Sequence, residues 1–249
     1  IPYAAFHGHY QNSAQHADGS ITTAFNTHPG GLDHRTQVYV ITSSDGGISW
    51  TDLEGRSLDL PLQSMDNSAL ALDARKQNNL TYIMDLAVTE EGEPVVLFLT
   101  SKDSATGPKG GDRIWKTLHH QSSKGWHEKP VGSSSHNYDC GSLLIDGSHW
   151  KIIGPTGIGP QGVHTGGEIE AFTSSDQGDS WERKPLTQRS LQNHTYAKKT
   201  IPSHASFVAF WADGHPTEES DSHLYFCNSE GDVFRMPKDM NEEWESPLK

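Results

Sequence analysis

Several stretches of the sequence bring together side chains that could carry out acid–base chemistry on a bound ligand. In GHY and FNTHPGGLDHR, His9 and His28 lie 19 residues apart across one acid–glycine turn, which predicts adjacent strand ends. Histidine exchanges protons near neutral pH, although a hydrogen-bonded loop histidine is the alternative interpretation. Arg35 follows, and its guanidinium could hold a carboxylate through two parallel hydrogen bonds. An ion pair with Asp33 would explain Arg35 equally well.

Two further stretches combine loop-like composition with polar side chains. SSSHNYDCGS carries His136 and Tyr138 immediately before an expected strand, and strand-end loops are common places for functional residues. GPTGIGPQGVHTGGEIE is rich in glycine, which permits close backbone approach to a ligand, and it carries Gln161, His164 and Glu168. It lacks the Gly-Lys-Ser/Thr ending of a phosphate loop. We therefore expect both stretches to contribute to one site, with a buried polar loop as the alternative for the first.

A fourth stretch, NHTYAKK, has functional side chains at every second position. His194, Tyr196 and Lys198 alternate with smaller residues. Successive side chains of a strand point to opposite faces of the sheet. If this stretch is a strand, the three side chains share one face and could line the same site.

Composition limits the partners of the chain. The net charge of -13, with only 19 lysines and arginines, argues against nucleic acid as a partner. No stretch approaches the ~20 apolar residues of a membrane-spanning helix. His7 and His9, and His119 and His120, form close pairs, but two adjacent histidines do not make a tetrahedral ligand set. We predict no cofactor, with a structural zinc or calcium ion as the alternative, and the sequence leaves open whether the two cysteines pair.

An internal repeat indicates the fold. SSDGGISW at 43–50 recurs as SSDQGDSW at 174–181. Aspartate accepts backbone hydrogen bonds in turns, glycine takes positive φ, and tryptophan can bury a large ring under the hairpin. The octet is therefore predicted to stabilise a turn rather than to catalyse. Four units run from an acid–glycine turn to a tryptophan: Gly19 to Trp50, Gly92 to Trp126, Gly147 to Trp181, and Gly214 to Trp244, with Gly231 competing for the place of Gly214.

The segments between these landmarks read as short strands. Residues 36–44, 168–175 and 222–229 alternate apolar and polar side chains, whereas 94–101 is a continuous apolar run typical of a strand buried on both faces. Only 68–77 is a weak helix candidate. Repeated units of small sheets that stack around an axis are typical of a β-propeller. We predict an all-β chain with about four to five blades, forming a single domain over residues 1–249.

The octets match S-x-D-x-G-x-x-W, the Asp-box of sialidases and other propellers with bacterial neuraminidase repeats. The sequence also resembles a bacterial sialidase-like propeller family in the stretches FNTHPGG, HNYD, GSLLIDG, IIGPTGIGPQ, GGEIE, NHTYAKK and FWADG. That family is similar to seven-bladed polysaccharide lyases such as ulvan lyases and rhamnose–glucuronate lyases. The resemblance implies that this chain is part of a seven-bladed propeller, truncated at its N-terminus. It also places arginines where Lys198 and Lys199 stand, and lysine cannot fork a carboxylate as arginine does.

The resemblance implies a polysaccharide lyase that cleaves a uronate-containing glycan by β-elimination. The expected catalytic residues are His28, His136, Tyr138, His194 and Tyr196, and the expected substrate-binding residues are His9, Arg35, Gln161, His164, Glu168 and Lys198. A sialidase-like exo-glycosidase and a non-catalytic carbohydrate-binding propeller are the alternatives. The partner would be an acidic polysaccharide or oligosaccharide, with no nucleic acid and no membrane. The protein is expected to be a secreted or periplasmic monomer.

Overall fold

The computed structural model describes residues 3–5, 9–111, 113–162 and 164–249. Its strands form four antiparallel sheets, each made of consecutive stretches of the chain. The first sheet contains β1 (His9–Gln15), β2 (Ile21–Thr27), β3 (Gln37–Ser43), β4 (Trp50–Thr51), β5 (Ser57–Leu58) and β6 (Leu70–Asp73), and the second contains β7 (Leu80–Val88), β8 (Pro94–Ser101), β9 (Arg113–Gln121) and β10 (Gly125–Ser134). The third contains β11 (Ser142–Asp146), β12 (His149–Gly157), β13 (Glu168–Ser174) and β14 (Glu182–Pro185), and the fourth contains β15 (Asn193–His204), β16 (Phe207–Gly214), β17 (Leu224–Cys227) and β18 (Val233–Arg235).

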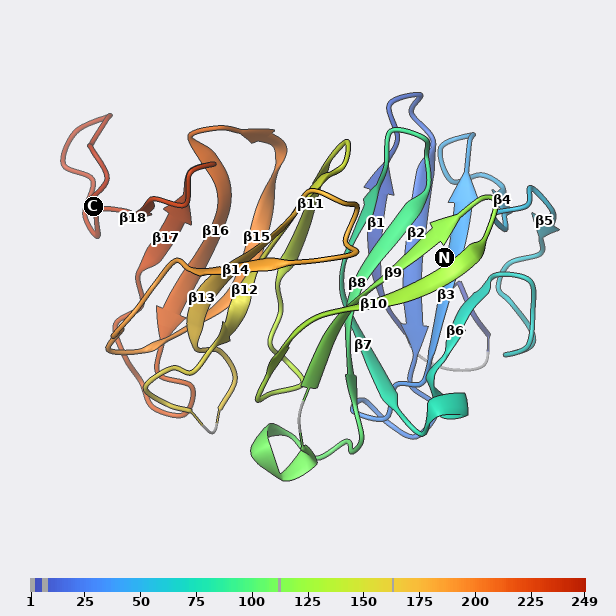
Figure 1. The fold of residues 1–249 in the computed structure, drawn as a ribbon, viewed down its shortest axis with the longest axis horizontal. Helices are drawn as coiled ribbons and strands as arrows, with labels where there is room; N and C mark the ends of the chain where they lie inside the picture. Colours follow the sequence, from blue (N-terminus) through green and yellow to red (C-terminus); the bar gives the residue numbers. More distant parts are fainter. Residues whose placement is uncertain (1–2, 6–8, 112, 163) are drawn as a thin grey trace.

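The four sheets lie side by side in chain order, from the first at the right of Figure 1 to the fourth at the left. The first strand of each sheet is innermost, since β1 packs on β7, β7 on β11, and β11 on β15. These four inner strands run in the same direction along the axis of the arc (Figure 1). This arrangement confirms the all-β propeller predicted from the repeat, with four blades.

Apolar side chains fill each contact between neighbouring sheets. One cluster joins the first and second sheets, a second joins the second and third, and a third joins the third and fourth. Strand β8 takes part in two of these clusters, and all eight of its residues are buried. Because β8 lies between two packed layers, all of its side chains face apolar surroundings, which explains the continuous apolar sequence of 94–101.

The two octets form the same turn. In the first, the Ser43 hydroxyl donates to Asp45 Oδ1 at 2.8 Å, and Asp45 accepts from the backbone N–H of Ser49 at 2.9 Å. Asp176 makes equivalent bonds with Ser174 and Ser180 in the second. Hydrogen bonds from the serines lower the pKa of each aspartate to about 2. The predicted role of the octet as a turn is confirmed.

The fourth repeat unit was assigned to the wrong residues. Gly214 ends β16 instead of forming the first hairpin turn of its sheet, and Trp244 is 85% exposed near the C-terminus. Gly231, with φ of +87°, occupies the turn between β17 and β18, where Asn228 accepts the backbone hydrogen bonds. Loop lengths vary more than sheets do, so spacing alone misplaced the unit. The weak helix candidate at 68–77 is β6 followed by a short 3-10 helix, η1 (Ala74–Gln77).

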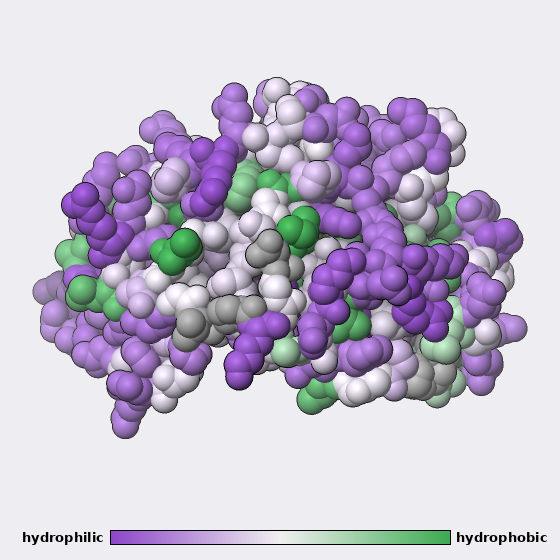
Figure 2. All heavy atoms as spheres, turned by 60° about the horizontal axis from the view of Figure 1, so that its bottom comes forward, coloured by the Kyte–Doolittle hydropathy of each residue, from purple (hydrophilic) through white to green (hydrophobic). Residues whose placement is uncertain are grey.

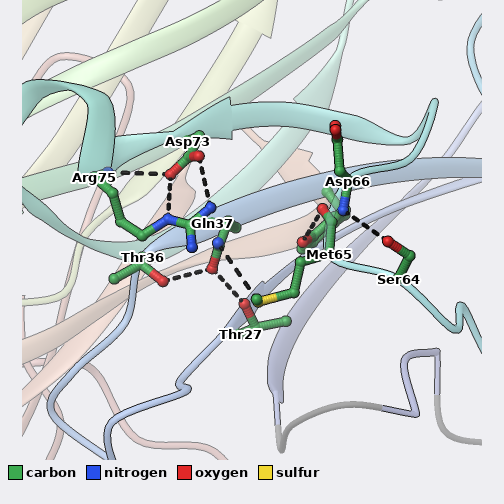
Figure 3. A network of polar contacts seen from close by, with 9 residues as sticks. Thr27, Thr36, Gln37, Ser64, Met65, Asp66, Asp73 and Arg75 are labelled. Atoms are coloured by element: carbon green, nitrogen blue, oxygen red, sulfur yellow. Dashed lines mark hydrogen bonds and ion pairs between the residues drawn. The ribbon is translucent and has the colours of Figure 1, made fainter.

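Two features anchor the parts of the fold that carry the site. Where β2 ends and β3 begins, the Gln37 amide lies within hydrogen-bonding distance of the Thr27 and Thr36 hydroxyls, next to an ion pair between Arg75 and Asp73 (Figure 3). This network closes the base of loop 28–35.

In the part of the chain that the structure describes, no helix is long and apolar enough to cross a bilayer.

Candidate active site

The predicted functional loops meet at one end of the arc. Loop 28–35, the segment 135–141 before β11, and the loop 158–166 lie along the lower edge of Figure 1, where the inner strands begin. Figure 2 brings this end forward and shows pale side chains across its middle, between more hydrophilic side chains on either side. The propeller therefore presents loops of several sheets at a single mouth.

Arg35 is the centre of this mouth. The residue is only 7% exposed, and its Cζ lies 4.2 Å from the Tyr10 ring centroid. The rings of Tyr82 and Tyr138 lie 4.9 Å and 5.6 Å from the same atom. Arg35 Nε donates to the Leu32 carbonyl at 2.8 Å. Within the described residues, the guanidinium has no carboxylate in ion-pair distance, so the Asp33 ion pair considered above is not formed.

Two tyrosines instead fasten loop 28–35 to the neighbouring sheets. The Tyr138 hydroxyl donates to the Asp33 carboxylate, and the Tyr82 hydroxyl donates to the Asp33 carbonyl oxygen. The His28 ring lies 5.8 Å from that of Tyr10, on the same loop as Arg35. The first and second sheets and the segment 135–141 thus hold His28 and Arg35 in place, which limits the entropy lost when a ligand binds.

Asp139 organises the segment that carries His136. Its carboxylate accepts from the backbone N–H groups of His136 at 3.0 Å and Gly166 at 2.7 Å. Burial raises the pKa of Asp139 to about 6, because desolvation outweighs these hydrogen bonds. The Tyr138 N–H donates to His136 Nδ1 at 3.1 Å, which leaves the ring proton of neutral His136 on Nε2.

Burial also lowers the pKa of His136, and repulsion from the charges of Arg113 and His164 adds to this effect. The imidazole is therefore a neutral donor near pH 7. His164 lies in the loop 158–166, where its N–H donates to the Gln161 carbonyl at 3.0 Å. The structure thus places His28, Arg35 and His136 in the loops of this mouth, and their roles stay predictions.

The start of β15 supplies Tyr196 and Lys198 from the fourth sheet. Tyr196 is 53% exposed, and the Lys198 ammonium lies 5.9 Å from its ring centroid. The charge of Cys140 raises the pKa of Tyr196, with burial as the second cause. Arg35 and Lys198 both act electrostatically on the half-buried Cys140 thiol. Tyr196 and Lys198 therefore border the Arg35 centre.

The predicted alternation in β15 is interrupted, and His194 does not share a face with Tyr196. Tyr196 has φ of +54°, and the pairing with β16 shifts between Thr195 and Lys198. Such a bulge reverses the side-chain alternation downstream of it. His194 is consequently 2% exposed, accepts from Trp211 Nε1 at 3.1 Å, and lies 2.8 Å from the Ser190 hydroxyl.

Gln161 and Glu168 lie with His194 in the joint between the third and fourth sheets. Gln161 accepts from the backbone N–H of Asn193 at 2.8 Å. Glu168 accepts from the Ser190 hydroxyl and N–H, each at 2.8 Å. These contacts tie β13 to β15, and they use the polar atoms that a substrate would need. These three residues are therefore engaged in contacts of this joint.

Lys199 also serves the fold. Its ammonium binds Asp85 Oδ2 at 2.9 Å and the carbonyl oxygens of Leu86 and Leu143 at 2.9 Å and 3.0 Å. Asp85 in turn accepts from the Leu143 N–H at 2.8 Å. One buried ion pair thus links the inner strands β7, β11 and β15 below the mouth.

Several sequence hypotheses concern residues away from this centre. His7 lies outside the described residues, and the structure describes His9 only as part of the β1 backbone. His119 packs on Trp150 and His120 on Trp126, so the pair diverges. In the described ranges, no group of three histidine, cysteine or acidic side chains could hold a metal ion. Cys140 and Cys227 are both free thiols.

Sequence reasoning missed two members of the mouth, Tyr10 and Tyr82. Tyr82 lies in the apolar stretch LTYIMDLAV, where the sequence predicts a tyrosine that only packs in the core. Its buried ring does pack in the core, but its hydroxyl reaches the loop 28–35. Tyr10 lies in the stretch GHY beside His9, yet only its three-dimensional stacking on Arg35 indicates a role.

Known structures resemble this fold at low sequence identity. An ulvan lyase of polysaccharide lyase family PL25 superposes with a TM-score of 0.69 and 13% identity, over 89% of this chain and 51% of the other. The polysaccharide lyase Uly1 gives 0.58 and 15%, over 89% of this chain and 46% of the other. An α-L-arabinanase of Penicillium chrysogenum complexed with arabinobiose gives 0.57 and 10%, over 94% and 68%. No protein-family model and no curated protein sequence matches the chain.

These similarities establish the fold shared with carbohydrate-active propellers. The chain spans about half the length of the lyase structures that it resembles. At such identity the activity has to be argued from the residues of the Arg35 centre.

Proposed function

We propose that this protein is a polysaccharide lyase that cleaves a uronate-containing glycan by β-elimination at the Arg35 centre. The observation that carries this proposal is a buried guanidinium that three tyrosines surround and that has no acidic side chain within ion-pair distance among the described residues. Burying a charge without a partner is costly. A uronate carboxylate would supply the missing negative charge through two parallel hydrogen bonds.

The elimination needs three groups, and the centre offers each of them. Arg35 neutralises the carboxylate, which makes the neighbouring C5 proton more acidic. His28 takes that proton, the electron pair forms the C4=C5 double bond, and the C4–O bond breaks. Tyr196 gives its hydroxyl proton to the departing oxygen, since its raised pKa keeps the hydroxyl protonated. His136 donates from Nε2 and positions the sugar.

The exposed tyrosines indicate how a polymer would lie. Tyr10 is 46% exposed on the first sheet and Tyr196 is 53% exposed on the fourth. Sugar rings stack on such surfaces. Lys198 adds a positive charge beside Tyr196, so an acidic chain would be favoured across the mouth. A polymeric substrate also favours an enzyme that works outside the cytoplasm, secreted or periplasmic.

Support for this substrate class comes from a related fold. A PL25 ulvan lyase structure bound to -[GlcA(1-4)Rha3S]- superposes with a TM-score of 0.67 and 12% identity. That ligand contains a uronate, the group that Arg35 is proposed to hold. The similarity adds to the argument from Arg35 and does not replace it.

A glycoside hydrolase is the second candidate, since an arabinanase has a similar fold. Hydrolysis usually requires two carboxyl groups roughly 5–10 Å apart. Asp139 and Glu168 were the sequence candidates, but backbone N–H groups and the Ser190 hydroxyl already engage them. The structure therefore favours elimination. A binding module would use the same surfaces without turnover.

One assay separates the three functions. The protein is incubated with a panel of uronate-containing polysaccharides while the ultraviolet absorbance of the conjugated C4=C5 product is followed. A growing absorbance supports the lyase, new reducing ends without it indicate a hydrolase, and binding without either indicates a module. His28→Ala should abolish turnover with little change in melting temperature, whereas His149→Ala, at the exposed turn between β11 and β12, should keep it. Full activity of His28→Ala would remove His28 from the mechanism.

A further inference from the structure

A polar cavity lies between the second and third sheets, outside the mouth. Its volume is about 240 Å³, and its walls come from β9, from β10 and from the turn of the second octet. Because the strands of each sheet alternate in direction, β9 and β13 run in the same sense as the inner strands. The two strands therefore end away from the mouth, and the octet turn follows the end of β13. We call this space the octet cavity.

The strand wall of the octet cavity contains buried polar atoms without hydrogen-bond partners. Thr117 is 1% exposed and His119 is 6% exposed, yet neither the Thr117 hydroxyl nor His119 Nε2 forms a hydrogen bond within the described residues. His127 pairs with His119 across the two strands, and its buried Nε2 also has no partner there. Glu93 Oε2 lies 3.3 Å from His119 Nε2, but the two are not aligned for a hydrogen bond. Buried polar groups are nearly always hydrogen-bonded, so three such groups in one wall indicate an occupant.

The two octets differ at two positions, and both of these positions line the cavity in the second octet. Gln177 and Asp179 stand where the first octet has Gly46 and Ile48. Gln177 has a left-handed φ of +57°, a conformation that Gly46 adopts freely at +75°. A residue other than glycine is strained in this conformation. Formation of the turn therefore does not explain Gln177, whereas contact of its side chain with an occupant does.

The charges around the cavity indicate a neutral occupant. Lys129 Nζ lies 3.1 Å from Asp179 Oδ1, and Asp176 accepts from two serine hydroxyls of its own turn. Lys124, the remaining lysine of the wall, is exposed to solvent. An ionic occupant would have to compete with these contacts.

The groups that lack partners can each donate or accept hydrogen bonds. A threonine hydroxyl does both, a neutral imidazole has one nitrogen of each kind, and the Gln177 amide adds a further donor and acceptor. Hydroxyl groups of a ligand match this set, because they also donate and accept. The volume lies just below the ~300–1,000 Å³ of pockets for drug-sized ligands and far above the ~10–15 Å³ that one water needs. A single polyhydroxylated ring is an occupant of suitable size.

We propose that the octet cavity binds one sugar unit of a neutral glycan, at a site separate from the Arg35 centre. The hydroxyls of the sugar pair with Thr117, with the two histidine rings and with Gln177. The ligand differs in charge from the acidic chain proposed for the mouth. Binding here does not depend on the proposed lyase activity, because no group of the Arg35 centre takes part.

The two histidine rings make binding directly measurable. The full chain, labelled with ¹⁵N, is titrated with the neutral methyl glycosides of glucose, galactose and mannose, and the imidazole resonances are followed by two-dimensional NMR. The resonances of His119 and His127 should shift saturably with at least one of these sugars, whereas those of His28 and His136 should not. A ligand of about twelve heavy atoms should bind with a dissociation constant of about 1 mM.

Two substitutions test the site while keeping the fold. Thr117→Val keeps the shape of the side chain and should weaken binding about 3- to 10-fold through the loss of one neutral hydrogen bond. Gln177→Gly gives the second octet the glycine of the first. It should weaken binding by a similar factor and keep or raise the melting temperature, because glycine relieves the left-handed backbone. The matched control is Ile48→Asp, which gives the first octet the aspartate of the second at an 87% exposed position and should leave the affinity unchanged.

Each other outcome overturns the proposal. If no sugar shifts the two rings at concentrations well above millimolar, the cavity holds water only. Wild-type affinity in both Thr117→Val and Gln177→Gly would place the sugar elsewhere, and a loss of affinity in Ile48→Asp would point to the first octet. Saturable shifts with methyl glucuronide but with no neutral sugar would contradict the neutral class. The absorbance assay for elimination is read separately, so failure of this site and failure of the proposed lyase are distinguishable.

Discussion

Replacing Arg35 by lysine tests the proposed carboxylate site with the least disturbance to charge. Lysine keeps the positive charge but cannot form two parallel hydrogen bonds in one plane. Arg35 is held by the Leu32 carbonyl and by stacking on three tyrosine rings, so the bond most affected is the one to the substrate. A hydrogen bond to a charged group contributes about 1.5–3 kcal/mol. Arg35→Lys should therefore lower kcat/KM by about 10- to 100-fold, at 1.36 kcal/mol per factor of ten.

The assay is the initial rate of C4=C5 absorbance on the most active uronate polysaccharide. Both kcat and 1/KM should fall, because the carboxylate is bound in the ground state and gains charge during elimination. The melting temperature should fall by only a few degrees, since roughly 1 kcal/mol of stacking is lost. Arg56→Lys is the matched control, because its side chain is 61% exposed and pairs with Asp52. An unchanged kcat/KM for Arg35→Lys would refute the carboxylate role.

Three further outcomes follow from the fold around the site. Folding raises the pKa of Asp139 from 3.8 to about 6, so the folded protein holds this proton more tightly. The contribution of Asp139 to stability should be complete below pH 4 and fall by about 3 kcal/mol as pH rises through 6, at 1.36 kcal/mol per pKa unit. Asp139→Asn should remove this part of the pH dependence in denaturation curves. Lys199→Met should lower the free energy of unfolding, measured by urea titration, by about 3–5 kcal/mol, because the Asp85 carboxylate loses its ion-pair partner. The control, Lys198→Met, should lower it by much less. Asp176→Ala should lower the melting temperature above pH 4 much more than near pH 2, because the parent carboxylate, with a pKa of about 2, is then partly protonated and its stabilising contribution is largely lost. Equal effects at both pH values would show that the charged carboxylate does not stabilise the turn.

Local patterns predicted much of the fold. The alternation of 168–175, the apolar run of 94–101 and the two octets each depend on neighbours in sequence, and the structure has them where expected. The fourth unit failed because Gly214 and Trp244 fit a spacing that loop lengths do not preserve. A sequence repeat thus predicts the number of blades more securely than it predicts which residues occupy the same position in each blade.

The site was predictable where residues of suitable type lay in loops. His28, Arg35 and His136 were singled out in this way, and the structure places them in loops at the same end of the arc. His194 could not be separated from Tyr196, because the bulge that divides them is set by pairing with β16. Tyr82 could not be predicted as a site residue, because its strand has the apolar sequence of a core strand and only its hydroxyl reaches the mouth.

The most direct test of the central claim compares two ligands that differ only at the carboxylate. A uronate oligosaccharide and its carboxyl-reduced counterpart are titrated into the protein by calorimetry. If Arg35 receives the carboxylate, the reduced sugar should bind at least tenfold more weakly to the wild type and about equally weakly to Arg35→Ala. Equal affinity of the wild type for both ligands would contradict the account.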